Sequence, residues 1–80
     1  MFATNAQMTH INRVCLQALT KALQQAQDGA EIDEFYSTLE FMPLHISTVI
    51  ALNNAESRED YIQAIEYGLR YEQQWRENNA

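Results

Sequence analysis

Positively charged residues are scarce in this sequence, and none lies between Lys21 and Arg58. The 36 residues between these two positions carry six carboxylates. Nucleic-acid binding depends on Lys and Arg side chains that displace counterions from phosphate groups. The middle of the chain would instead repel a phosphate backbone, so the sequence argues against nucleic acid as a partner.

Cysteine is also nearly absent, since Cys15 is the only one in the chain. A single Cys without a CxxC partner excludes an internal disulfide and a cysteine zinc site. This composition favours a reducing compartment, and we expect a cytoplasmic protein. No apolar run approaches the roughly 18 residues of a membrane span. Because the first ten residues also lack the pattern of a signal peptide, we expect neither export nor membrane insertion.

What the chain does contain is enough apolar sequence for one small core. Its 80 residues are 46% hydrophobic and include four Tyr, three Phe and one Trp. A chain of this length buries only about 60% of its unfolded surface, so self-association would supplement its stability. The net charge is -6. We expect one domain over residues 1–80, with flexible ends at about 1–4 and 78–80.

Helix breakers are few and divide the chain into four segments. Gly29, Pro43 and Gly68 are the only Gly and Pro residues. The apolar periodicity between them predicts helices at about 5–27, 31–41, 44–53 and 58–77. The fold class is therefore all-α, a small bundle in which two long antiparallel helices flank a short helix-turn-helix pair.

The first long helix has a complete set of start and stop signals. Thr4 is the expected N-cap, with Gln7 at the capping-box spacing, and Asp28-Gly29 ends the helix. One face of the helix is apolar. Its members are Met8, Ile11, Cys15, Ala18, Leu19, Ala22, Leu23 and Ala26.

The short middle helices meet at Pro43, which stops the first and could occupy the first turn of the second. The second of them has Ile46, Val49, Ile50 and Leu52 as apolar positions, which we expect to pack between the long helices. A β-strand is the alternative for this stretch. Its apolar positions do not alternate cleanly and no second strand is available, so helix is favoured.

The last helix begins after Ser57, with Asp60 placed for a capping box. We expect Glu72 and Arg76 to form an i,i+4 pair on its solvent side, as do Glu66 and Arg70. Its main apolar stripe comprises Tyr61, Ile62, Ile65, Gly68, Leu69 and Trp75.

Aromatic residues at the edge of that stripe are the first candidate site. Tyr67, Tyr71 and Trp75 follow one another at i, i+4 and i+8. Part of this row can be explained by burial in the fold. Because Tyr and Trp are also enriched at binding hot spots, we predict a protein interface here.

Acidic residues form a second candidate, with Glu31, Asp33 and Glu34 clustered at a predicted helix start. Compensation of the helix dipole accounts for carboxylates at this position. The alternative is an anionic surface that occupies a cationic groove on a partner.

His45 is the third candidate, since we expect it to lean toward the apolar side of its helix near Val49 and Leu52. A half-buried histidine there could titrate near neutral pH and alter an interface, or could simply be a packed residue bonded to a backbone carbonyl.

The sequence gives no support for catalysis. His10 and Cys15 are among its obvious reactive residues, but they cannot act together because they lie about 140° apart around one helix. We therefore predict no catalytic residues, no cofactor and no metal.

The sequence as a whole predicts a small acidic adaptor or regulator that acts by protein binding, as a homodimer, and is not an enzyme. One alternative is a helix-turn-helix DNA-binding regulator that uses residues 38–54. Another is an acidic inhibitor of a basic or nucleic-acid-binding protein.

Overall fold

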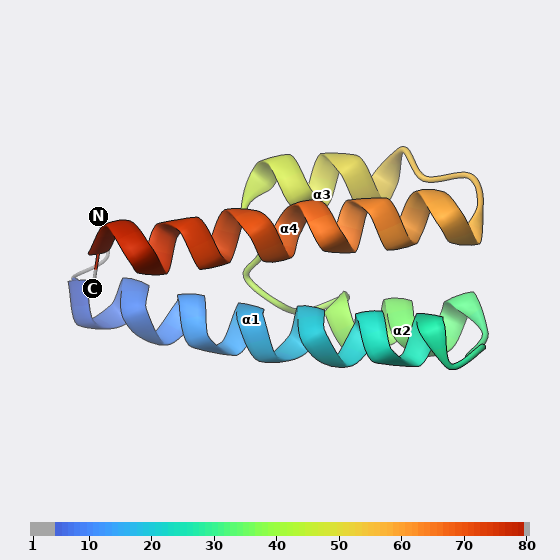
Figure 1. The fold of residues 1–80 in the computed structure, drawn as a ribbon, viewed down its shortest axis with the longest axis horizontal. Coiled ribbons are helices and arrows are strands. Elements are labelled where there is room, and N and C mark those ends of the chain that lie inside the picture. The colour runs from blue at the N-terminus through green and yellow to red at the C-terminus, as the bar shows by residue number, and fades with distance from the viewer. Residues whose placement is uncertain (1–4, 80) are drawn as a thin grey trace.

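Residues 5–79, the part of the chain that the computed structural model describes, form four helices and no strand. They are α1 (Asn5–Gln27), α2 (Ile32–Leu39), α3 (Ile46–Asn53) and α4 (Arg58–Asn79). The long helices α1 and α4 run antiparallel, so the start of α1 and the end of α4 share one end of the molecule (Figure 1). The predicted all-α fold is confirmed.

The two short helices lie on different long helices. Helix α1 packs against both α2 and α4, whereas α3 packs against α4 (Figure 1). The two short helices therefore follow one another in the chain as expected, but α2 is held chiefly by α1 and α3 chiefly by α4. None of the described helices is both long and apolar enough to cross a bilayer.

The core lies where the four helices meet, and small residues on α1 let the other helices approach it closely. Phe35 and Ile65 are fully buried against this helix. The buried cluster comprises Ala18, Leu19, Ala22, Ala26, Phe35, Leu39, Leu52, Ala64 and Ile65. The apolar face predicted for the first helix is thus the face that packs.

Helix α1 ends in a glycine cap. Gly29 has a φ of 90°, a conformation that costs glycine little. Its N–H donates to the Ala26 carbonyl (3.3 Å), and the Ala30 N–H donates to the Gln25 carbonyl (2.9 Å). These two bonds form a Schellman motif and satisfy carbonyls that would otherwise lack partners.

The connection between α2 and α3 is longer than predicted, because α2 ends at Leu39 and α3 begins at Ile46. The residue before a proline disfavours helical backbone, so the chain leaves the helix ahead of Pro43. His45 is extended (φ -60°, ψ 145°) and caps α3. The expectation that Pro43 occupies the first turn of the third helix is therefore wrong.

Helix α3 presents a different side to the core from the one predicted. Thr48 and Leu52 are buried, whereas Ile46 and Ile50 are exposed. Thr48 packs closely against Gly68 of α4, where the missing side chain leaves room for it. The prediction that Ile46 and Ile50 pack between the long helices is wrong.

Helix α4 begins with the predicted capping interaction. The Asp60 N–H donates to Ser57 Oγ (3.2 Å), and Asp60 Oδ2 accepts from the Glu56 N–H (3.1 Å). The helix continues to Asn79, so residues 78 and 79, expected as part of a flexible end, are helical. Thr4, the predicted N-cap of the first helix, and the expected flexible residues 1–4 and 80 lie outside the described residues.

Candidate functional site

A small pocket with mostly apolar walls lies between α1, α4 and the connection that precedes α3. Its volume is about 70 Å³. Three residues singled out from the sequence, His45, Tyr71 and Trp75, come together at this place. The lining residues are Met8, Ile11, Asn12, Pro43, His45, Tyr71, Glu72 and Trp75, and we call this site the Glu72 pocket.

The carboxylate that gives the pocket its name is buried. Glu72 is only 6% exposed, and Asn12 beside it is buried as well. Asn12 Nδ2 donates to the Glu72 backbone carbonyl (2.8 Å) and to Glu72 Oε1 (2.9 Å). The prediction that Glu72 lies on the solvent side with Arg76 is wrong. Its burial is tolerated because an amide from the other long helix supplies a hydrogen bond.

Cys15 contacts the pocket residue Pro43 and is fully buried, as predicted for a core residue. Its thiol donates to the Pro43 carbonyl (3.3 Å). Burial raises the pKa of the Cys15 thiol to about 11, and the Glu72 carboxylate acts in the same direction. The group therefore stays protonated at neutral pH, which keeps it unreactive as a nucleophile.

His45 is exposed at the rim of the pocket and does not lean on Val49 and Leu52, contrary to expectation. Its Nδ1 accepts the Ser47 N–H (3.2 Å), so the neutral ring carries its proton on Nε2. The ring stacks on Tyr71 with centroids 4.1 Å apart and 27° between planes. His45 thus ties the start of α3 to α4.

Tyr67 lies apart from the other two aromatic residues of the predicted row. It is 42% exposed, whereas Tyr71 and Trp75 are half-buried in the Glu72 pocket. Tyr67 borders a shallow groove between α3 and α4 that Ala51 also lines. The row at i, i+4 and i+8 is therefore divided between two surfaces.

Helix α3, which lines the groove beside Tyr67, also carries large apolar side chains on its outward side. Ile46 and Ile50, one helical turn apart, are 63% and 53% exposed. We call Ile46, Ile50 and Tyr67 the α3 face. Sequence periodicity assigned both isoleucines to the core, because α3 is short and apolar on most sides and its pattern does not distinguish the buried side from the exposed one.

The carboxylates singled out from the sequence gather at the end of the molecule opposite the Glu72 pocket. Glu31, Asp33 and Glu34 are all exposed at the start of α2. The α1–α2 and α3–α4 connections both lie at this end of the molecule (Figure 1). This acidic end holds Asp28, Glu31, Asp33, Glu34, Glu56, Glu59 and Asp60.

One guanidinium lies among these seven carboxylates, so the acidic end carries the whole net charge of -6. That group, Arg58, donates from Nη1 to the Ala26 carbonyl at the end of α1 (3.3 Å) and lies 5.8 Å from the centre of the Phe35 ring. Asp33 and Glu34 occupy the first turn of α2, where the helix dipole favours anions. The helix start alone is sufficient to explain Asp33 and Glu34.

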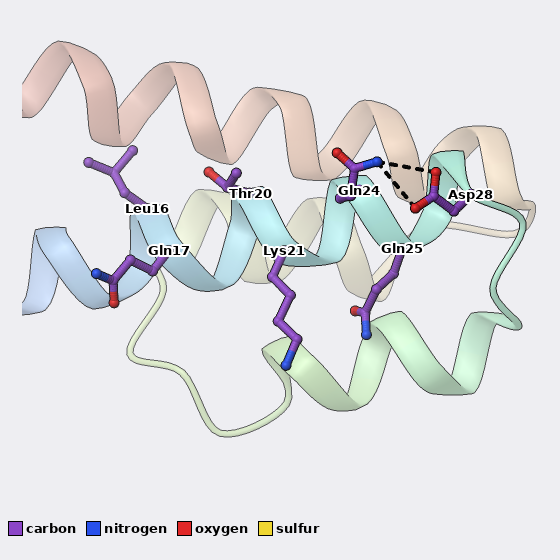
Figure 2. Close-up of a pocket in the computed structure, with 7 residues that line it drawn as sticks. All are labelled: Leu16, Gln17, Thr20, Lys21, Gln24, Gln25 and Asp28. Atoms are coloured by element: carbon purple, nitrogen blue, oxygen red, sulfur yellow. Dashed lines mark hydrogen bonds between the residues drawn. The ribbon is translucent and has the colours of Figure 1, made fainter.

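A wider depression of about 550 Å³ lies on the outer side of α1 (Figure 2). Lys21 and Gln25 extend from it toward α2. Two of its three amides already have partners, since Gln24 Nε2 donates to Asp28 Oδ1 (3.1 Å) and Gln25 Oε1 accepts from Thr38 (2.8 Å). We regard this depression as ordinary solvated helix surface.

Within residues 5–79, no three His, Cys, Asp or Glu side chains are grouped so as to hold a metal ion. The chain matches no protein-family model, no curated protein and no solved structure.

Proposed function

We propose that this protein acts by binding protein, as an adaptor or regulator, and that it works as a homodimer whose two copies meet through the α3 face. The observation that carries the proposal is the exposure of Ile46 and Ile50 on a helix otherwise held to the fold. Large apolar side chains grouped on the surface of a small protein are typical of interaction sites.

A second copy suits this face because the part of it on α3 is uncharged. Residues 41–55 contain no Asp, Glu, Lys or Arg. Two molecules that approached one another through their acidic ends would repel, because each of these ends carries a net charge of -6. The α3 face is where they can approach without bringing like charges together.

Symmetry supports the same arrangement. In a two-fold dimer the same patch meets itself. In the antiparallel arrangement of the two copies of α3, Ile46 of one copy would meet Ile50 of the other. The C-terminus of α3 points to the acidic end (Figure 1). Antiparallel pairing therefore directs the two acidic ends away from each other.

The size of the face sets the expected affinity. A standard interface covers about 800 Å² on each partner, roughly one seventh of the 5562 Å² surface of this chain. Three side chains and their neighbours form a smaller core than that. We therefore expect a dissociation constant on the order of 10 µM.

The test is sedimentation or light scattering from about 1 µM to about 1 mM protein. The unmodified chain should pass from monomer to dimer over this range, and Ile46→Glu with Ile50→Glu should remain a monomer. Gln73→Glu with Gln74→Glu, exposed on α4, adds the same charge elsewhere and should leave the dimer intact. A strict monomer at the highest concentration, or a dimer unaffected by the Ile variants, would contradict the proposal.

DNA binding by residues 38–54 is the weaker alternative. A recognition helix reads base edges with polar side chains and is anchored by Lys or Arg on phosphates. The outward side of α3 offers Ile46 and Ile50 at the positions that would face a groove. Binding of the chain to duplex DNA at low salt, with steep loss on added salt, would favour this alternative.

A further inference from the structure

We infer that the Glu72 pocket binds an organic ammonium group, either the primary ammonium of a lysine-like chain or a methylated ammonium. The pocket combines a buried carboxylate with aromatic and apolar walls, and these are the groups that recognise such a cation. The inference is independent of the dimer, because the pocket does not include the α3 face.

The carboxylate supplies the negative charge. An ionised carboxylate offers about four acceptor positions. Among residues 5–79, the side-chain amide of Asn12 is the hydrogen-bond partner of the Glu72 side chain. A buried carboxylate is costly unless a cation or several donors compensate it. A cation in the adjoining space would provide that compensation.

The aromatic walls favour an organic cation. Tyr71 and Trp75 line the same pocket as the carboxylate, and the ring of His45 holds Tyr71 in place by stacking on it. Aromatic rings attract ammonium groups through their quadrupole, most strongly when water is excluded. Met8 and Ile11 complete the wall with apolar surface that suits N-methyl groups.

The size of the pocket and the residues that line it narrow the class of molecule that it can bind. The cavity volume of about 70 Å³ is several times the roughly 10 to 15 Å³ that a cavity needs in order to hold one water. This space admits an ammonium head whose chain projects into solvent, and it excludes a nucleotide base. A hard metal cation would require six or more oxygen ligands, whereas Glu72 provides the only carboxylate of the pocket lining.

Trp75 provides the readout, because it is the single tryptophan of the chain. Its fluorescence is followed during titration with choline chloride, tetramethylammonium chloride or n-butylammonium chloride, against sodium chloride at equal ionic strength. We expect saturable changes with a dissociation constant on the order of 1 mM for the ammonium salts, and none with sodium. Tighter binding of choline would indicate a small methylated ammonium ligand, whereas tighter binding of butylammonium would indicate a lysine side chain.

A neutral molecule of the same shape separates charge recognition from a merely apolar cavity. Choline should bind to the unmodified protein at least about tenfold more tightly than 3,3-dimethylbutan-1-ol, since only choline gains from the carboxylate and the ring faces. Equal binding of the two, or no saturation by any ammonium salt, would overturn the inference.

Glu72→Gln tests the residue itself and should weaken choline binding at least about tenfold. Glu66→Gln makes the same change of charge on the exposed side of α4 and should bind as the unmodified chain does. Circular dichroism verifies that both variants are folded. Unchanged affinity in a folded Glu72→Gln protein would also overturn the inference, and the choline comparison above remains decisive if that variant does not fold.

Discussion

The Cγ2 methyl group of Thr48 lies where a side chain on Gly68 would begin, 2.7 Å from the position of an ideal Cβ. Leu19 of α1 closes the same space at 3.3 Å. Helices α1, α3 and α4 therefore meet at a point where only glycine fits on α4. In a helix interior glycine costs about 1 kcal/mol relative to alanine, and here close packing offsets that cost.

Gly68→Ala should lower the free energy of unfolding by about 1 to 3 kcal/mol, because overpacking at Thr48 outweighs the gain in helix propensity. Urea denaturation measures the change. Thr48→Ser removes the clashing methyl group, so the double variant should lose less than the two single losses combined. Additive losses would show that the two side chains do not compete for this space.

Asn12→Leu should destabilise the protein by about 2 kcal/mol or more, because Glu72 loses the amide that bonds its buried carboxylate. Thermal unfolding of this variant is compared with that of Asn12→Leu combined with Glu72→Met. The double variant removes the buried charge and should recover much of the loss. Equal stability of the two variants would argue against a buried charge at position 72.

The stability of the protein should fall as the pH rises from about 9 to about 11, because burial raises the pKa of Cys15. In this window the unfolded thiol has lost its proton while the folded thiol keeps it. The unfolded state then binds fewer protons, so the free energy of unfolding decreases with pH. Cys15→Ala should show a shallower decrease in urea titrations across this window, whatever its stability at neutral pH. Identical slopes in the two proteins would contradict the prediction.

His45→Ala should cost about 1 kcal/mol of stability, since it removes both the N-cap of α3 and the ring stacked on Tyr71. His45→Ser retains a capping oxygen and removes only the ring. It should therefore lie between His45→Ala and the unmodified protein in thermal unfolding. If Ser and Ala were equally destabilising, the cap would contribute nothing.

Much of the fold could be predicted because its signals are local. The first helix extends over the predicted residues, since apolar periodicity and the Gly29 stop signal agree. The ends of α2 and α3 were harder to predict from the sequence. The His45 ring acts as the N-cap of α3, and histidine is not among the residues usually preferred there, which are Ser, Thr, Asp and Asn.

The Glu72 pocket could be predicted only in part. His45, Tyr71 and Trp75 were identified from their residue type, but Asn12 and Glu72 meet across 60 positions of sequence. A glutamate four residues before an arginine has the pattern of a solvent-exposed pair. Periodicity nevertheless places Glu72 one turn after Gly68, on the side that packs against α1 and α3, and that was the signal that could have revealed its burial.

The concentration of charge at the acidic end gives the molecule a large permanent electric dipole along its 36 Å length. A body with such a dipole rotates as it diffuses toward a charged surface, so its collisions are not random in orientation. It meets a basic surface with the α1–α2 and α3–α4 connections first and turns those connections away from an acidic one. Salt shortens the range of this torque to about 8 Å at physiological ionic strength.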